Sequence, residues 1–282
     1  AGTAALEYRT VSCPDLKLAP GIFSRSSLLA DETFTAHYAT PLVVKGQIKG
    51  VLELFHRNTV DPDPEWINYF ETLATQAAIA IESASLLENL QRSNTELKLA
   101  YDATIEGWSR ALDLRDRETE GHTQRVTKMA LELAEKMGME DTEKQNLWRG
   151  SLLHDIGKMG VPDSILLKNS PLTQSEWEIM RMHPTYAHQM LSPISYLKNA
   201  LEISYCHHEK WDGSGYPRGL KGEHIPFSAR LFAVVDAWDS MTAERPYRPA
   251  LSALEAQTYI REQSGKHFDP DVVTAFLKML AI

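Results

Sequence analysis

The sequence predicts an α+β protein in which a long helix joins an N-terminal α/β part to a C-terminal part built from helices alone. Two apolar runs separated by a short turn between residues 39 and 57 indicate a β-hairpin. No proline occurs from residue 65 to about residue 114, which indicates one long helix or two in tandem. After residue 110 the apolar periodicity is helical and strand signals are weak.

The predicted hairpin pairs Pro41–Val44 with Val51–Phe55 through a turn at residues 45–47. The loop Asp61–Pro64 is suited to cap the start of the long helix. Further helices follow in the C-terminal part, separated by loops rich in glycine and proline at residues 159–173 and 211–227. The predicted helices span residues 124–136, 143–154, 174–183, 195–208, 228–242 and 253–264.

The middle of the long helix carries an apolar seam with a seven-residue repeat. This helix either packs on its own domain or pairs with its copy in a homodimer, and we favour the homodimer. The polar residue Asn94 would then help to fix the register of the two helices. The seam consists of Leu73, Ala80, Leu87, Asn94, Tyr101 and Trp108, with Leu90 and Leu97 between them.

Composition narrows the class of protein. At 282 residues the chain is long enough for one large domain or two ordinary ones, and its net charge of −9 argues against a nucleic-acid polymer as partner. Two cysteines, Cys13 and Cys206, are too few for a disulfide framework. No apolar run approaches the ~20 residues of a membrane span. The chain begins at Ala1 within what reads as mid-domain sequence, so we expect a segment of a longer cytoplasmic protein.

Two adjacent pairs of metal-type side chains, His154-Asp155 and His207-His208, are the strongest chemical signal in the chain. An aspartate beside a histidine suits two metals bridged by its two oxygens, although a histidine at a helix C-terminus is an alternative. Glu118 and His122 share one face of a helix, which suits a metal clamp and also occurs on solvated faces. Eight side chains are candidates to converge on a polynuclear centre: Glu118, His122, His154, Asp155, His183, His207, His208 and Asp236.

Three cationic residues have spacings that suit phosphate. Lys158 lies one turn beyond His154, where its ammonium can face a bound phosphate. Arg245 and Arg248 are three residues apart, which suits bidentate phosphate recognition, although a solvated basic turn is the alternative.

The segment after His208 and a later apolar stretch hold further candidates. The Gly213-x-Gly215 turn would leave room for a ligand close to the backbone, and Tyr216 could stack on a base or bond to a phosphate. Asp239 lies in an apolar stretch, where a carboxylate is costly unless it is paired. We favour Asp239 as a partner of a metal ligand over direct ligation.

Together these motifs resemble the HD-GYP family of cyclic di-GMP phosphodiesterases, a branch of the HD phosphohydrolases. The resemblance runs from about Tyr101 to Ile282 and includes the Gly-Tyr-Pro that names the family. Its motifs are His154–Lys158, His207–Pro217, Asp236–Arg248 and Phe268–Pro270.

The resemblance implies a metal site formed by all eight candidates. A glutamate at position 118 is similar to members with three metals, so it implies a trinuclear iron site, with manganese as the substitute. Members with another residue at this position hold two. We expect Asp155, Lys158 and Asp239 to be the catalytic residues. The implied substrate contacts are Lys158, Tyr216, Arg245 and Arg248.

The N-terminal part is similar to the second half of a GAF sensor domain, through residues 39–44 and 48–55 and the helix from residue 65. Its first strands are missing, so we expect a partial domain. The expected organisation is a partial sensor domain at residues 1–83, a helical linker at 84–100 and a catalytic domain at 101–282. The expected homodimer forms through the N-terminal domain and the linker.

These expectations lead to a predicted activity. A hydroxide bridging the metals would attack phosphorus in line and convert cyclic di-GMP to pGpG, with a second cut giving GMP. Asp239 or a metal-bound water would give the leaving oxygen its proton. Three other interpretations stay open: hydrolysis of another cyclic dinucleotide such as cyclic GMP-AMP, a cyclic di-GMP receptor without turnover, and oxygenation at a di-iron site.

Overall fold

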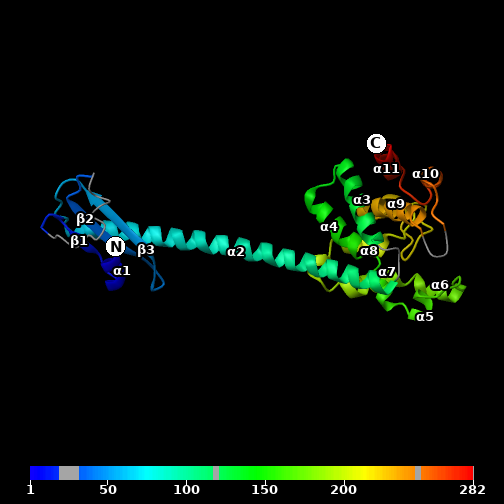
Figure 1. Cartoon of the computed structure of the whole chain (residues 1–282), viewed down its shortest axis with the longest axis horizontal. Helices are drawn as coiled ribbons and strands as arrows, with labels where there is room; N and C mark the ends of the chain where they lie inside the picture. The colour runs from blue at the N-terminus through cyan, green and yellow to red at the C-terminus, as the bar shows by residue number, and fades with distance from the viewer. Residues whose placement is uncertain (19–31, 117–120, 245–248, 282) are drawn as a thin grey trace. The chain divides into compact units, whose positions relative to one another are not determined.

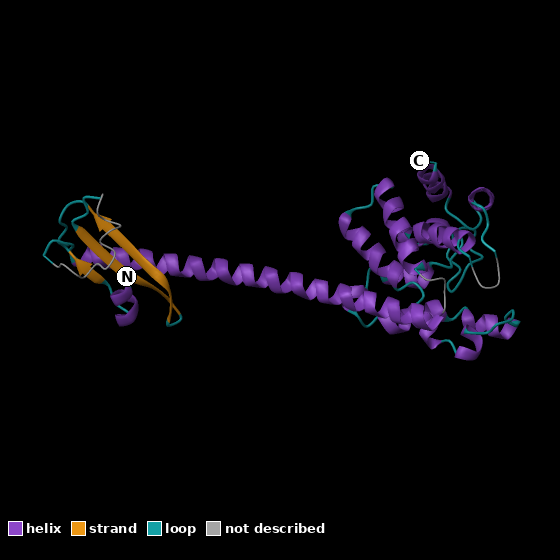
Figure 2. Ribbon diagram, in the orientation of Figure 1, coloured by secondary structure: helices purple, strands orange, loops and turns teal. Residues whose placement is uncertain are grey.

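The computed structural model describes residues 1–18, 32–116, 121–244 and 249–281. These residues form two compact units, Ala1–Lys98 and Leu99–Ile282, whose elements are drawn in Figure 1. All three strands of the described chain belong to the N-terminal unit, and the described C-terminal unit is helical (Figure 2). The predicted α+β class is therefore confirmed.

The N-terminal unit contains a three-stranded antiparallel sheet in the order β1-β2-β3. The turn at Lys45 and Gly46 has positive φ angles of 51° and 76°, which match the right-handed twist of a tight hairpin. The predicted hairpin is present, and its first strand begins three residues earlier than residue 39. The elements are α1 (Gly2–Glu7), β1 (Val11–Cys13), β2 (Ala36–Val44) and β3 (Gln47–His56).

One uninterrupted helix, α2 (Pro64–Asp116), follows the sheet and continues into the C-terminal unit. Asp63 caps its start as predicted, because its Oδ1 accepts the N–H of Trp66 at 2.8 Å. Phe70, Ala74 and Ala78 recur every four residues and are buried in the small cores beneath the sheet.

Two further stretches of α2 differ in burial. Ile105, Ser109 and Leu112 form the face that is buried in the C-terminal unit. Every side chain from residue 84 to residue 100 is exposed. No helix among the described residues is long and apolar enough to cross a membrane.

The C-terminal unit is a helical domain with two cores. The larger lies between α3, α4, α9, α10 and α11, and the smaller joins α2 to α4, α7 and α8. The elements are α3 (His122–Lys136), α4 (Asp141–Leu152), η2 (Ile156–Gly160), α5 (Asp163–Leu166), α6 (Gln174–Met180), α7 (His183–Leu191), η3 (Ser195–Leu197), α8 (Leu201–Cys206), η4 (Gly222–His224), α9 (Phe227–Thr242), α10 (Ala253–Glu262) and α11 (Pro270–Leu280).

Two predicted helices are wrong in extent. The helix predicted at 174–183 ends at Met180, because Pro184 lacks an N–H and favours the first turn of a new helix, α7. The helix predicted at 195–208 is divided into η3 and α8. At the break, the Ala200 carbonyl packs so closely on Gly150 of α4 that a Cβ there would lie 2.6 Å from its oxygen.

Candidate metal centre

Helix ends supply most of the predicted metal ligands. His122 is the first residue of α3, His183 is the first of α7, and Asp236 lies within α9. The other four follow the ends of α4 and α8. Seven predicted ligands lie in the described chain and form two groups, in each of which the ligand atoms lie within 4.8 Å of one another. One group is Asp155, His183, His207 and His208, and the other is His122, His154 and Asp236.

Asp155 lies between the two groups. Its Oδ2 is 3.0 Å from Nε2 of His154, which belongs to the other group. Its Oδ1 is 3.3 Å from Nε2 of His183 and 3.7 Å from Nε2 of His207. Each oxygen of this carboxylate therefore faces a different set of imidazoles, which is the arrangement that a bridging ligand needs.

Backbone carbonyls fix the tautomers of three histidines. Nδ1 of His154, His183 and His207 donates to the carbonyls of the third or fourth preceding residue, at 2.8, 2.8 and 3.0 Å. Because a carbonyl can only accept, the proton lies on Nδ1 and the lone pair of each Nε2 faces the centre. Nε2 of His183 and Nε2 of His207 are 3.3 Å apart, so their lone pairs repel unless a cation lies beside them. This donor set fits divalent metal ions.

A carboxylate orients His122 from the other side of its ring. Asp239 Oδ2 accepts from Nδ1 of His122 at 2.7 Å, which directs Nε2 towards Asp236, 3.4 Å away. Arg125 holds the same carboxylate through Nε at 2.7 Å and Nη2 at 2.9 Å. Asp239 belongs to neither group of candidate ligands.

Electrostatics keep His183, His208 and Asp155 in the protonation states that metals require. Burial lowers the pKa of His183 to about 4 and lowers the pKa of His208 well below its usual range. Burial would raise the pKa of Asp155, but His154 and Lys158 outweigh it and lower that pKa well below its usual value. Burial also lowers the pKa of His154, yet Asp155 and Asp236 raise it more, so this position favours a positive charge.

Two of the predicted substrate contacts lie beside the centre. Lys158 Nζ is 2.8 Å from Asp155 Oδ2. The ring of Tyr216 stacks on His208 with 4.8 Å between centroids, and the guanidinium of Arg181 lies 5.5 Å above the tyrosine ring. Burial raises the pKa of Tyr216, which keeps its hydroxyl protonated. The remaining predicted site residues, Glu118, Arg245 and Arg248, lie outside the described residues.

A family model described as an HD domain matches residues 107–272, more than half of the chain. The chain belongs to the HD-domain family. The matched range includes all eight predicted ligands, and a second model, described as a GAF domain, matches residues 1–82. The resemblance to HD-domain enzymes and the resemblance of the N-terminal part to a GAF domain are confirmed.

Two curated relatives are named as cyclic di-GMP phosphodiesterases. A cyclic di-GMP phosphodiesterase of Vibrio cholerae is 39% identical over 214 residues, 71% of this chain and 44% of that protein. One of Thermotoga maritima is 46% identical over 171 residues, 59% of this chain and 46% of that protein. This chain thus spans about half the length of these relatives. A solved cyclic GMP-AMP specific phosphodiesterase of V. cholerae shares the fold, with a TM-score of 0.50 and 18% identity over 63% of this chain and 48% of its own.

Glycines of the HD domain serve its own packing. A Cβ at Gly157 would lie 1.8 Å from the carbonyl oxygen of His183, so only glycine lets η2 approach the start of α7. A Cβ at Gly215 would lie 2.5 Å from Cα of Glu209. The expectation that Gly215 leaves room for a ligand is therefore wrong, because the protein's own backbone fills that space. Glu209 completes this loop by accepting from the N–H groups of Arg218 and Leu220.

The sequence did not indicate two residues that support the site. Arg125 contacts Asp239, and Asp116 contacts Lys158. Neither residue belongs to a metal-type pair, and the only available signal was their proximity in sequence to His122.

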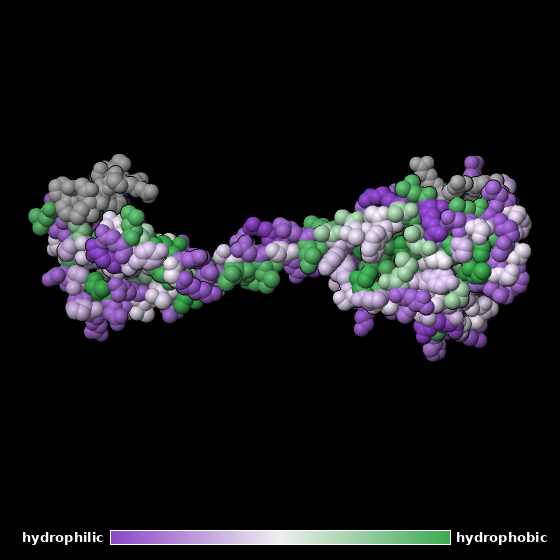
Figure 3. Space-filling view, turned by 90° about the horizontal axis from the view of Figure 1, so that it is seen from below, coloured by the Kyte–Doolittle hydropathy of each residue, from purple (hydrophilic) through white to green (hydrophobic). Residues whose placement is uncertain are grey.

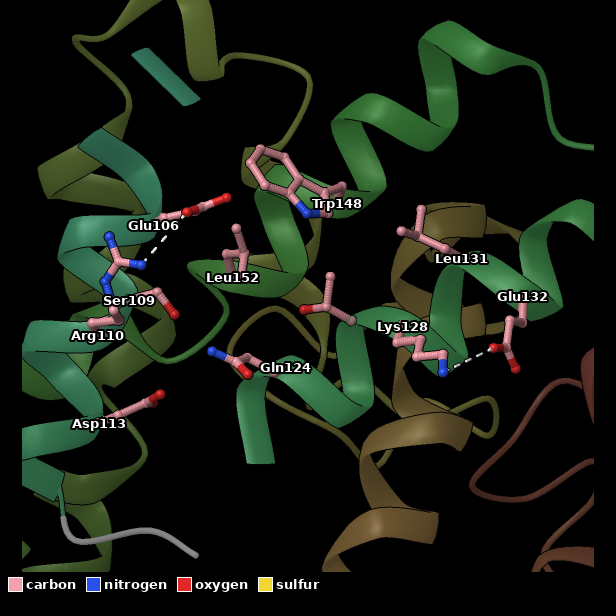
Figure 4. Close-up of a pocket in the computed structure, with 11 residues that line it drawn as sticks. Glu106, Ser109, Arg110, Asp113, Gln124, Lys128, Leu131, Glu132, Trp148 and Leu152 are labelled. Carbon is pink, nitrogen blue, oxygen red and sulfur yellow. Dashed lines mark ion pairs between the residues drawn. The ribbon is translucent and has the colours of Figure 1, made fainter. Parts of the chain in front are cut away.

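A cavity of about 420 Å³ also lies in the HD domain, between α2, α3 and α4 (Figure 4). None of the candidate ligands lines it, and its cations pair with acids of their own helices, Arg110 with Glu106 and Lys128 with Glu132.

Proposed function

We propose that this chain is a metal-dependent phosphodiesterase that hydrolyses cyclic di-GMP to pGpG or GMP. The observation that carries the proposal is the position of Asp155, whose two oxygens face two adjacent groups of ligand-type side chains. Two metals held by these groups would stabilise the attacking and leaving oxygens of an in-line displacement at phosphorus. The names of the two curated relatives support cyclic di-GMP as the substrate.

The proposed ligands are the seven side chains of the two groups together with Glu118. They would hold two or three divalent ions, with iron favoured and manganese as the alternative. The proposal of a third ion depends only on the presence of Glu118 in the sequence, because that residue lies outside the described chain. When bound, such ions lower the pKa of a coordinated water and so supply a nucleophile at neutral pH.

The remaining proposed site residues act on the substrate or on a ligand. The ammonium of Lys158 and the guanidiniums of Arg245 and Arg248 would neutralise charge on the phosphoryl oxygens. The protonated hydroxyl of Tyr216 would donate to a phosphate. Both oxygens of Asp239 are engaged by His122 and Arg125, which favours an orienting role over transfer of a proton to the leaving group.

The test is product analysis with metal-loaded protein. Cyclic di-GMP and cyclic GMP-AMP compete in one reaction, and the proposal expects pGpG or GMP to form faster from cyclic di-GMP. Asp155→Ala should abolish turnover while the protein stays folded. Faster loss of cyclic GMP-AMP would favour the specificity named for the solved V. cholerae enzyme. Tight binding of cyclic di-GMP without turnover, in protein with a full complement of metal, would instead identify a receptor.

We further propose a sensor domain at residues 1–83, a linker at 84–100 and a catalytic domain at 101–282, in a homodimer that pairs through the first two. The exposed linker supports pairing, because a single helix in water gains little from an apolar seam. Figure 3 shows hydrophobic side chains gathered along this part of α2. Leu87, Leu90 and Leu97 are 57%, 67% and 51% exposed.

The dimer is tested by light scattering after size-exclusion chromatography. Leu90→Glu should convert the dimer to a monomer, because it places a charge in the paired seam. Glu88→Gln, outside the seam, is the matched control and should stay dimeric. A monomeric wild-type chain at micromolar concentration would contradict the proposal. The cytoplasmic location stays a prediction.

A further inference from the structure

The last residue of α2 contacts the HD motif directly. Asp116 Oδ2 lies 2.6 Å from Nζ of Lys158, and the two side chains are only 9% and 12% exposed. The same Nζ lies 2.8 Å from Oδ2 of Asp155. Lys158 therefore connects the end of the long helix to the carboxylate between the two ligand groups.

Neighbouring residues of α2 hold the same region through other contacts. Arg115 donates to the carbonyl oxygens of Lys158 at 3.1 Å and Val161 at 2.9 Å. Asp113 accepts from the hydroxyl of Thr123, the residue after His122, at 2.9 Å. The final turn of α2 thus fixes both the backbone and the side chain of Lys158 and lies against the start of α3.

We infer that Asp116 is a positioning residue that holds the Lys158 ammonium beside Asp155, so that the position of the α2 end determines where this cation lies. The inference rests on the proposed function, in which Lys158 acts on the phosphoryl group. Removal of one carboxylate beside a buried ammonium takes away part of the attraction that holds it in place. Without Asp116, the Nζ of Lys158 would keep its contact with Asp155 and lose the one that ties it to the end of α2.

The packing beside this turn leaves space for α2 to shift. Glu106, Ser109, Arg110 and Asp113 line the α2 side of the cavity shown in Figure 4, and α3 and α4 line the other side. A close-packed interface would resist displacement of this helix. An interface that contains a cavity of about 420 Å³ resists it less. A displacement of the end of α2 would therefore change the contact between Asp116 and Lys158.

A kinetic double-mutant cycle tests the inference. Asp116→Ala and the isosteric Asp116→Asn should lower kcat about tenfold and change KM by less than about twofold, with the metal content unchanged. Adding Asp116→Ala to Lys158→Met should slow the enzyme no further, because Asp116 acts through Lys158. Glu106→Gln, which removes a carboxylate of the same helix that pairs with Arg110, should match the wild type. Wild-type kcat in Asp116→Ala, or fully additive losses, would overturn the inference.

A melting-temperature cycle on the same proteins separates this inference from the proposed function. Asp116→Asn and Lys158→Met should each lower the melting temperature, and the double variant should lower it by less than the sum. Additive shifts would show that the two residues are not coupled and would overturn the inference without reference to activity. If wild-type protein loaded with metal releases no product from any cyclic dinucleotide, the proposed function fails, and the melting cycle still decides whether Asp116 holds Lys158.

Discussion

Nε2 of His183 and Nε2 of His207 lie 3.3 Å apart, and Nδ1 of each ring donates a hydrogen bond to a backbone carbonyl. Two lone pairs directed at each other in a buried site repel, and a divalent cation between the ligands removes that repulsion. We therefore expect metal removal to destabilise the HD domain. At a free metal concentration of a hundred times Kd, binding contributes about 2.7 kcal/mol, which corresponds to several degrees in Tm.

Calorimetry of metal-loaded and chelated protein measures this difference. His183→Ala removes one of the two nitrogens, so its Tm should respond less to chelation than that of the wild type. An unchanged wild-type Tm after verified removal of the metal would contradict the prediction.

Asp239→Asn should weaken metal binding while the fold remains. The variant keeps the size of the side chain but removes the charge that orients His122 and pairs with Arg125. Loss of such a partner typically reduces metal affinity ten- to a hundredfold. Metal content after dialysis against a graded chelator measures the change. Glu132→Gln, which removes an exposed carboxylate of α3 that pairs with Lys128, is the control and should retain the wild-type content.

Gly157→Ala should destabilise the domain by about 3 kcal/mol or more, because the added Cβ would meet the His183 carbonyl at 1.8 Å. Gly107→Ala is the matched control, since nothing lies within 4 Å of its added Cβ in α2. A helix-interior glycine costs about 0.5–1 kcal/mol relative to alanine, so this variant should be stabilised. Urea unfolding compares the two, and equal effects would refute the packing role of Gly157.

The free energy of unfolding should fall as the pH falls below about 6.5, because His267 is partly buried in the folded chain. Burial lowers the pKa of His267 in the folded chain to about 4, and Lys210 lowers it further. Between these two values the unfolded chain binds a proton that the folded chain does not, so the contribution is complete above the unfolded pKa and is lost towards pH 4. By pH 4 the loss is about 3 kcal/mol.

The measurement is urea unfolding of wild type and His267→Gln at pH 7.5 and pH 4.5. The difference between the two proteins reports the titration of His267 together with its electrostatic interaction with Asp212. The variant should lose less stability than the wild type on acidification. Equal losses would show that His267 titrates normally in the folded chain.

Local chemistry made much of this molecule predictable, and the failures have physical causes. The hairpin, α2 and the candidate ligands follow from periodicity, proline-free length and paired metal-type side chains. The division of the helices near Met180 and Ala200 depends on contacts with distant segments, which periodicity does not report. Asp116 and Arg125 act on residues 42 and 114 positions away. Gly215 was misinterpreted because a glycine that approaches backbone and one that approaches a ligand look alike in sequence.

The central claim is that Asp155 joins two metal sites that hydrolyse a cyclic dinucleotide. The most direct test is a metal count per chain on anaerobically purified wild type and Asp155→Ala, paired with product analysis on the same samples. We predict at least two metal ions in the wild type with release of pGpG or GMP from cyclic di-GMP, and loss of both metal and product in the variant. Wild-type turnover in a metal-verified Asp155→Ala protein would contradict the account.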